Sequence, residues 1–320
     1  GVAGDRGDVA MVGYGAARYA LASGNCNEAE KLWPLIEWCL EYCHRQLNAD
    51  GVVKSDSDEL ENRFPAGKAN LCTSSLYYDA LVSAAYLGKA LKKEHKQIKS
   101  YQDRAAELYK NIDAYFARNV EGYDTYRYYD GNTVLRSWIC IPLTMGIYDQ
   151  AKGTVEALFS DKLWMEYGLL TQSGTSTYWD RSTLYAFRGA YSCGARDIAT
   201  EYLDKYSATR LLGDHVPYAV EAWPEGNQRH LSTESALYCR IMTEGLFGIR
   251  PIALDAFMMT PQLPESWNTM SLKRICAFGS IFDIEVKRDK DDKLLVLIKK
   301  DHKIVKRSKI TNGKPIEVRI

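Results

Sequence analysis

The feature that most constrains the fold is a long series of helical segments that short and long connections join in alternation. Apolar residues recur at helical spacing through most of the first 250 residues, for example in "NEAEKLWPLIEWCLEYCHRQL" and "AAELYKNIDAYFARNV". This periodicity predicts about nine helices. Besides the three in residues 27–120, they are expected near 8–22, 134–147, 149–158, 182–194, 196–207 and 232–247.

The lengths of the connections predict how these helices pair. Short connections are expected around 92–100 and near residues 148 and 195. Long ones are expected at 48–71, 119–133, 159–181 and 208–231. Since short and long connections alternate, the helices should pair as hairpins, and all the long loops should emerge at one end. Loops of this length inside a compact domain are usually functional.

Composition excludes several classes of partner. Lysine plus arginine and aspartate plus glutamate both total 41, so the formal net charge is zero. Nucleic acids and anionic membrane surfaces select for basic proteins, so neither is an expected partner. No apolar run approaches the ~20 residues that cross a bilayer. The glycine-rich start "GVAGDRGDVAMVGYG" does not resemble a secretory signal, and the compartment stays open.

Motifs for metals and cofactors are not found. Cys39, Cys43 and His44 could share one helix face, but a fourth ligand at suitable spacing is missing, so packing explains the cysteines better. The stretch "DSDELE" lacks the glycine and the closing glutamate of a calcium loop. The stretch "GYGAAR" lacks the third glycine of a dinucleotide site. We therefore expect neither metal nor cofactor.

The long loops concentrate aromatic and polar residues, as in "DSDELENRF", "EGYDTYRYYDGN", "TQSGTSTYWDRST" and "HVPYAVEAWPEGNQRHLS". An ordinary solvated surface would instead be rich in lysine, serine and glycine. Aromatic rings stack on the C–H faces of sugars, while carboxylates and amides bind the hydroxyl groups. The loops therefore predict a carbohydrate site, with an oligosaccharide or polysaccharide as the partner.

After residue 250 the periodicity changes from helical to alternating. The stretch "GIRPIALDAFMMTPQLPESW" carries three prolines and cannot be a helix. The segments "SLKRICAFG", "SIFDIEVKR", "KLLVLIKK" and "PIEVRI" predict antiparallel strands, with "KDD" and "NG" as turns. We expect a mainly α protein with a helical-hairpin toroid at 1–250 and a small antiparallel β segment at 251–320, packed on it.

With this architecture, "EGLFGIRP" (Glu244–Pro251) and "TPQLPESW" (Thr260–Trp267) resemble the end of a six-hairpin, (α/α)6-barrel glycosidase, closest to the bacterial α-L-rhamnosidase group. The resemblance spans most of the chain and implies a glycoside hydrolase of carbohydrate metabolism, acting in polysaccharide degradation. It also implies a periplasmic or extracellular location. A complete barrel has twelve helices, so the chain is expected to begin inside the barrel. The oligomeric state stays open.

The resemblance also implies where the catalytic carboxylates lie. In related inverting enzymes the loops before the sixth and the twelfth helices supply the general acid and the general base. Counted back from the last helix, these loops are 56–64 and 218–232. Inverting hydrolysis independently needs two carboxyl groups roughly 6.5–9.5 Å apart across a sugar ring.

For the acid, Glu59 and Glu61 are the candidates. Trehalase-like enzymes carry an acidic residue four positions before an arginine–aromatic pair, and Glu59 has that relation to Arg63. Repulsion from neighbours such as Asp58 would favour the protonated form of Glu61. For the base, Glu221 is favoured over Glu225.

Glu234 lies in the first turn of the last helix, where the helix dipole stabilises a carboxylate whatever its function.

The group "YWDR" combines a stacking plane, a hydroxyl acceptor and a donor fork, although it could instead form a buried, salt-bridged corner. The candidate substrate-binding residues are Asp58, Asn62, Arg63, Tyr128, Asp130, Arg136, Trp138, Trp179, Asp180, Arg181, His215, Trp223 and His230.

Several functions stay open on this scaffold. The favoured one is an inverting, exo-acting glycosidase. A polysaccharide lyase would use a tyrosine or histidine base and an arginine, for which Tyr128, His215 and Arg136 are available. A glycoside phosphorylase would need a basic phosphate pocket in place of the base. A non-catalytic carbohydrate-binding protein would bind glycans without forming product.

Overall fold

The computed structural model describes residues 7–58, 63–212, 222–223 and 232–320, and its larger part consists of helical hairpins. The helices in these ranges are α1 (Asp8–Ser23), α2 (Cys26–Arg45), α3 (Leu71–Ala90), α4 (His95–Phe116), α5 (Ile141–Met145), α6 (Ala151–Leu158), α7 (Asp180–Ser192), α8 (Arg196–Tyr206) and α9 (Ser232–Arg240). The connections 24–25, 91–94, 146–150 and 193–195 are short, and 46–70, 117–140, 159–179 and 207–231 are long. The predicted alternation is confirmed.

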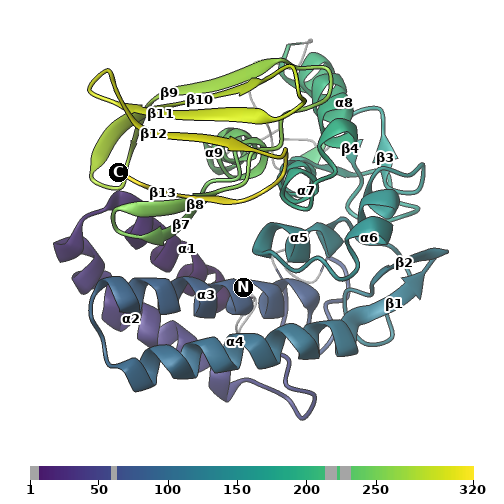
Figure 1. Cartoon of the computed structure of the whole chain (residues 1–320). Coiled ribbons are helices and arrows are strands. Elements are labelled where there is room, and N and C mark those ends of the chain that lie inside the picture. Colours follow the sequence, from purple (N-terminus) through teal and green to yellow (C-terminus); the bar gives the residue numbers. More distant parts are fainter. Residues whose placement is uncertain (1–6, 59–62, 213–221, 224–231) are drawn as a thin grey trace.

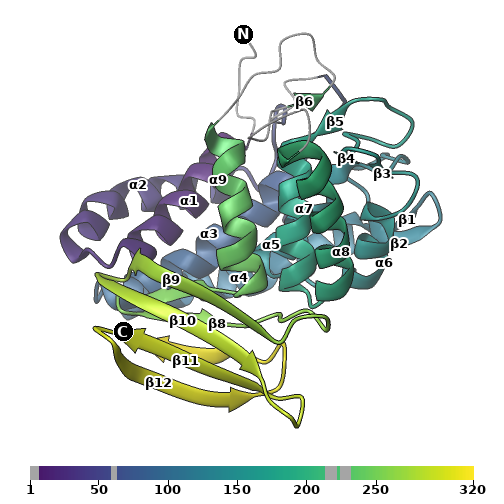
Figure 2. The same cartoon turned by 90° about the horizontal axis from the view of Figure 1, so that it is seen from above.

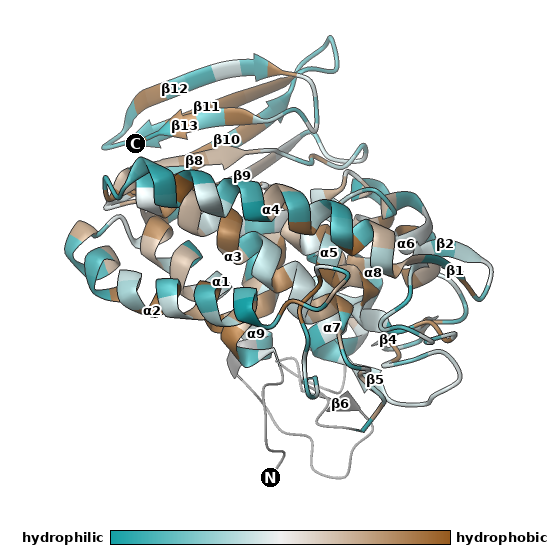
Figure 3. Cartoon of the chain, turned by 90° about the horizontal axis from the view of Figure 1, so that it is seen from below, coloured by the Kyte–Doolittle hydropathy of each residue, from teal (hydrophilic) through white to brown (hydrophobic). Residues whose placement is uncertain are grey.

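The helices form an inner and an outer layer. In Figure 1, α1, α3, α5, α7 and α9 surround the middle of the molecule, and α2, α4, α6 and α8 lie outside them. The inner helix α3 is buried along nearly its whole length, as a helix surrounded by neighbours must be. The outer helices α2 and α4 bury one stripe and turn polar residues outward (Figure 3). This arrangement follows directly from the amphipathic pattern of the sequence.

The inner helices all begin at one end of the body, which we call the loop end, and finish at the other, the sheet end. Gly7 at the start of α1 lies against Thr73 in the first turn of α3. Figure 2 shows α7 and α9 running from the loop end, where the short strands β5 (Tyr178–Trp179) and β6 (Ala222–Trp223) lie, towards the C-terminal sheets. The long connections reach the loop end, as predicted.

The long connections contain short hairpins that the sequence analysis did not predict. Strands β1 (Ala117–Val120) and β2 (Tyr123–Tyr126) pair through a turn at Glu121 and Gly122, which both have positive φ, of 50° and 97°. Strands β3 (Trp164–Met165) and β4 (Gly168–Leu169) form another hairpin. These pairings satisfy the backbone of the long connections.

The C-terminal region forms two antiparallel sheets in place of the single predicted one. One has the strand order β12–β11–β10–β9 and the other β13–β8–β7. The strands are β7 (Arg250–Ala253), β8 (Ala256–Met259), β9 (Thr269–Ala277), β10 (Ser280–Arg288), β11 (Leu294–Lys300), β12 (Lys303–Ile310) and β13 (Ile316–Arg319). The four predicted strands correspond to β9, β10, β11 and β13, whereas β7, β8 and β12 were not predicted.

The sheets join the helical body through close backbone contact at the end of α1. Phe278 N donates to Ala22 O at 2.6 Å, and Gly279 N donates to Ser23 O at 3.2 Å. A Cβ on Gly24, which has φ 69°, would lie 2.2 Å from the nitrogen of Gly279. Only glycine fits between the two backbones at this position.

The mainly α toroid with its small antiparallel β segment is confirmed, with local differences. The expected helix at 134–147 is a 3₁₀ turn, Ser137–Cys140, followed by the short α5, in which Pro142 cannot donate a backbone hydrogen bond. The last helix continues beyond α9 as a π-helical turn, Ile241–Leu246. None of the helices that the structure describes is long and apolar enough to cross a membrane.

Candidate functional site

Arg136 contacts the chain on both sides of the segment that carries the acid candidates. Its guanidinium donates to Asp58 Oδ2 at 3.4 Å and to Pro65 O at 3.1 Å. The same group lies between the rings of Phe64 and Tyr128, 5.0 and 4.7 Å from their centroids. Arg136 is only 1% exposed and Asp58 2%. The chain is therefore fixed immediately before and after residues 59–62.

An aromatic layer follows at the start of the inner helices. The Trp138 ring lies 4.4 Å from the ring of Trp179 and 5.4 Å from that of Tyr185, measured between centroids. Trp138 is 1% exposed and Trp179 is 2% exposed, so neither ring is an open stacking platform. The indole nitrogen of Trp138 is buried and makes no hydrogen bond to any described residue. It is a donor that a bound hydroxyl or water could use.

Asp180 and Arg181, which begin α7, form two separate ion pairs. Asp180 is buried and accepts a 2.8 Å hydrogen bond from Arg210, which is also buried. Arg181 donates at 2.7 Å to Glu234 Oε1, and the Glu234 side chain is fully buried. This geometry favours the salt-bridged corner for Asp180 over the exposed hydroxyl acceptor. Glu234 Oε2 is a buried acceptor without a hydrogen bond to a described residue.

The strand pair β5–β6 brings the loop of the base candidates to the same place. Ala222 pairs with Trp179, and Trp223 pairs with Tyr178. Further bridges join Tyr178 to Leu170 and Gln172 to Arg136. A run of backbone and side-chain contacts therefore connects Asp58, through Arg136 and Trp179, to residues 222–223, all at the loop end.

The remaining predicted residues divide into exposed ones and ones beyond the described ranges. Arg63 is exposed. Asp130 is 68% exposed in its side chain and pairs with Arg127. The predicted residues that lie outside the described residues are Glu59, Glu61, Asn62, His215, Glu221, Glu225 and His230, and of Trp223 only the backbone is described.

Beneath the aromatic layer lies a group of charged side chains that the sequence analysis did not predict. Four arginines and two carboxylates from α1, α3, α7, α9, the π-helical turn and β7 are joined by hydrogen bonds and ion pairs. We call them the arginine cluster: Arg18, Asp79, Arg188, Arg240, Glu244 and Arg250. A signal was present, because Asp79 and Arg188 are charged residues in the otherwise apolar stretches of inner helices.

Electrostatics in the cluster favour the ionised carboxylates. Burial alone would raise the pKa of Glu244, but Arg188, Arg240 and Arg18 outweigh it and hold that pKa well below its usual range. Burial likewise opposes ionisation of Asp79, and Arg18 and Arg250 lower its pKa overall. These carboxylates are therefore acceptors for arginine and not proton donors.

Metal ligands do not gather in the part of the chain that the structure describes. Within those residues, no three histidine, cysteine, aspartate or glutamate side chains lie close enough to hold an ion. Cys39 and Cys43, considered above as possible ligands, are each 1% exposed and pack in the core.

Comparison with solved structures identifies the fold. A structure named "Sialidase" superimposes with a TM-score of 0.72 at 15% identity, covering 95% of this chain and 32% of that one. The family 78 rhamnosidase of Bacillus sp. GL1 gives 0.56 at 13% identity, covering 88% and 29%. The α-L-rhamnosidase from Dictyoglumus thermophilum gives 0.54 at 13% identity, covering 93% and 37%. The chain therefore has the helical-toroid fold of these proteins, which confirms the resemblance at the level of fold.

The limits of this likeness are equally clear. The chain spans roughly a third of the length of these solved structures. No family model matches the chain, and no curated protein matches it significantly. At 13–15% identity the shared feature is the fold, and a function must be argued from the site.

Proposed function

We propose that this chain carries the catalytic toroid of a glycoside hydrolase, one that is inverting and exo-acting on an oligosaccharide derived from a polysaccharide. The observation that carries the proposal is that described residues next to both groups of candidate carboxylates lie at the loop end. Asp58 and residues 222–223, which flank those groups, are linked through Arg136 and Trp179. Two solved structures of the same fold are named as rhamnosidases, which supports a glycoside as the substrate.

The proposed mechanism uses two carboxyl groups on opposite faces of one sugar ring. Glu59 or Glu61 protonates the leaving glycosidic oxygen, while Glu221, with Glu225 as the alternative, removes a proton from the attacking water. The anomeric carbon then receives the water oxygen from the face opposite the leaving group, which inverts its configuration.

We also propose that residues 1–250 form the catalytic unit and 251–320 a supporting β unit.

Buried polar atoms at the loop end support a ligand with many hydroxyl groups. Trp138 Nε1 and Glu234 Oε2 are a donor and an acceptor that find no partner among the described residues. Buried polar groups are normally hydrogen-bonded, so such atoms indicate places for hydroxyls or ordered water.

The test is turnover of a panel of nitrophenyl glycosides and plant oligosaccharides, with product stereochemistry followed by NMR. Glu221→Gln should lower kcat by at least 100-fold and remove the acidic limb of the pH profile. Glu59→Gln and Glu61→Gln should identify the acid through loss of the alkaline limb. Glu201→Gln, at an exposed glutamate on α8 paired with Lys205, is the matched control and should retain full activity.

Other outcomes would replace the proposal. An unsaturated product absorbing in the ultraviolet would show a lyase, and turnover that requires phosphate would show a phosphorylase. Tight glycan binding without any product would show a binding protein. Unchanged turnover in both Glu221→Gln and Glu225→Gln would remove the proposed base.

A further inference from the structure

The arginine cluster carries more positive charge than its carboxylates balance. Four guanidinium groups face two carboxylates, Asp79 and Glu244, which leaves an excess of two positive charges. Asp79 and Arg188 are shielded from solvent, with side-chain exposures of 0% and 2%, whereas Arg240 and Arg250 are each 30% exposed. Burying uncompensated charge is costly, so a counter-charge is expected nearby.

The protein itself supplies only part of that counter-charge. The Tyr14 hydroxyl accepts hydrogen bonds from Arg188, at 3.0 Å, and from Arg240. Burial alone would raise the pKa of Tyr14, but Arg188, Arg240 and Arg18 together lower it overall. As a hydrogen-bond acceptor, the Tyr14 hydroxyl oxygen offsets part of the positive charge. Carbonyl groups at the C-terminal ends of α5 and α7 offset a further fraction, because a helix terminus contributes roughly half a charge.

A cavity of about 170 Å³ lies beside the excess charge, between the C-terminal ends of α5 and α7 and the strands β7 and β8. Arg18, Arg188 and Arg250 line it from three different elements. Arg188 Nη1 makes no hydrogen bond to any described residue. It forms an ion pair with Glu244 Oε2, at a distance of 3.6 Å. A buried cationic side chain, Arg188, therefore lines the cavity.

We propose that this cavity binds a small oxyanion, such as inorganic phosphate, sulfate or a simple carboxylate, through Arg18, Arg188 and Arg250. Planar guanidinium groups match the paired oxygens of such anions and donate charge-assisted hydrogen bonds to them. The volume holds a tetrahedral anion with a few waters, at roughly 30 Å³ per water, and is smaller than the ~300 Å³ of ordinary organic-ligand pockets.

The site is separate from the proposed reaction centre. Asp180 begins α7 at the loop end, and Ser192, which lines the cavity, ends it. Arg188, the proposed anion ligand on this helix, is eight residue steps from Asp180, which at about 1.5 Å each is about 12 Å. The anion would join α1, α7 and β7 at the sheet end, and so would bind the helical body to the C-terminal sheet.

Calorimetric titration of the full chain with phosphate, sulfate and acetate, at an ionic strength fixed with sodium chloride, tests the proposal. We expect saturable one-site binding, and a melting temperature that rises with anion concentration. Stronger binding of phosphate and sulfate than of acetate would assign the site to tetrahedral anions, and the reverse order to carboxylates. Absence of saturable binding for all three anions would overturn the proposal.

Variants with opposite expected effects separate the site from general destabilisation. Arg250→Gln, at the rim, should weaken binding at least 10-fold, and Arg188→Gln should do the same if it folds. Glu244→Gln removes a competing negative charge and should tighten binding several-fold, which a damaged fold would not do. Arg104→Gln, on α4 and paired with Glu41, is the control and should bind as the unmodified chain does. Unchanged affinity in Arg250→Gln would refute the assignment.

Discussion

The Asp180–Arg210 pair provides the sharpest test of the two interpretations of "YWDR". Their side chains are 1% and 2% exposed, and the contact is 2.8 Å. At an effective dielectric constant of about 20, two charges at this separation attract by about 6 kcal/mol, and the cost of desolvating them offsets a large part of that gain. Asp180→Asn preserves shape but removes the buried carboxylate charge that Arg210 contacts. We expect the free energy of unfolding to fall by about 3–5 kcal/mol.

Urea denaturation of the full chain, followed by circular dichroism, measures this loss. Asp204→Asn, at an exposed aspartate on the outer helix α8, is the matched control and should change the free energy by less than about 0.5 kcal/mol. The double variant Asp180→Asn/Arg210→Met should be more stable than Asp180→Asn, because it removes the buried guanidinium charge together with the carboxylate.

The opposite pattern would refute this reasoning. If Asp180→Asn left the urea midpoint unchanged and instead raised KM for a glycoside, Asp180 would be an exposed hydroxyl acceptor and not a structural anchor.

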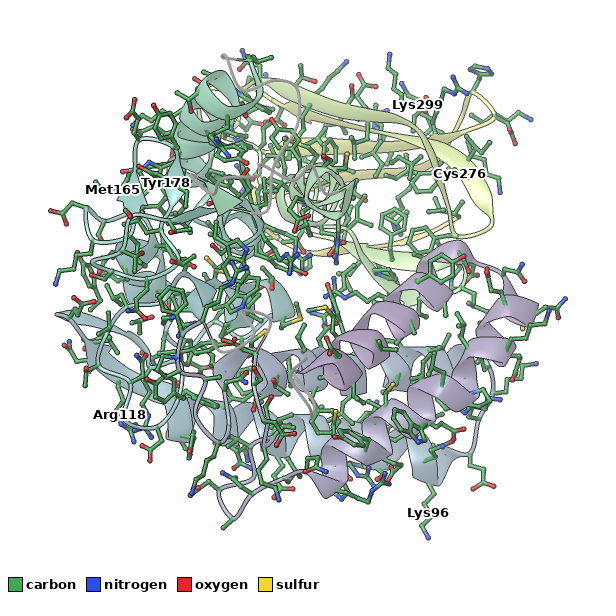
Figure 4. All side chains as sticks on the ribbon, turned by 180° about the vertical axis from the view of Figure 1, so that it is seen from behind. Lys96, Arg118, Met165, Tyr178, Cys276 and Lys299 are labelled. Carbon is green, nitrogen blue, oxygen red and sulfur yellow. The ribbon has the colours of Figure 1, made fainter. Side chains whose placement is uncertain are left out.

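Three further predictions concern the contact between α1 and the C-terminal sheet, the arginine cluster, and the cysteine thiols. Gly24→Ala should lower the free energy of unfolding by about 3 kcal/mol, because the methyl group would separate the two backbones at Gly279. The control Gly15→Ala adds a methyl group with no atom within 4 Å, so it should be neutral or slightly stabilising in thermal melts. The pKa of Asp79 is lowered on folding, so its contribution to the free energy of unfolding is present above pH 4 and is lost on acidification. In urea titrations from pH 6 to 3, the free energy of unfolding should fall more steeply in the unmodified chain than in Asp79→Asn. Parallel curves of this free energy against pH would contradict the prediction. Burial raises the pKa of Cys193 to about 11, so a thiol reagent at pH 8 should modify only the exposed Cys26, Cys239 and Cys276 rapidly (Figure 4 shows Cys276 on the sheet); a fourth fast thiol would be unexpected.

The helical architecture could be predicted from sequence because each amphipathic helix carries its own periodic signal. The loop alternation then fixed the pairing of helices and the common end of the long connections. Strand β12 escaped prediction because "KIVKRSKI" places basic residues on both faces. Such residues are typical of an edge strand, which β12 is, but they hide the alternation. Pro251 similarly hid β7, which also lies at a sheet edge.

The site was less predictable because its contacts join residues distant in sequence. The same polar–aromatic pattern serves an exposed sugar platform and a buried corner, and the partner of Asp180, Arg210, lies 30 residues away. Arg136, a candidate substrate-binding residue, contacts Asp58 and Pro65, one on each side of the segment that bears Glu59 and Glu61. Spacing along one loop contains no information on such partners.

Some contacts of the arginine cluster can form only late in the synthesis of the chain. Arg18 bonds to Glu244, 226 residues further along, and Asp79 to Arg250, 171 residues further along. The early hairpins therefore leave the exit tunnel well before their last electrostatic partners have been translated. Arg18 can pair with Asp79 early, but Arg188 meets Glu244 only near the end of synthesis, so a chain released before Glu244 would leave Arg188 without this carboxylate and would be more open to chaperones and proteases.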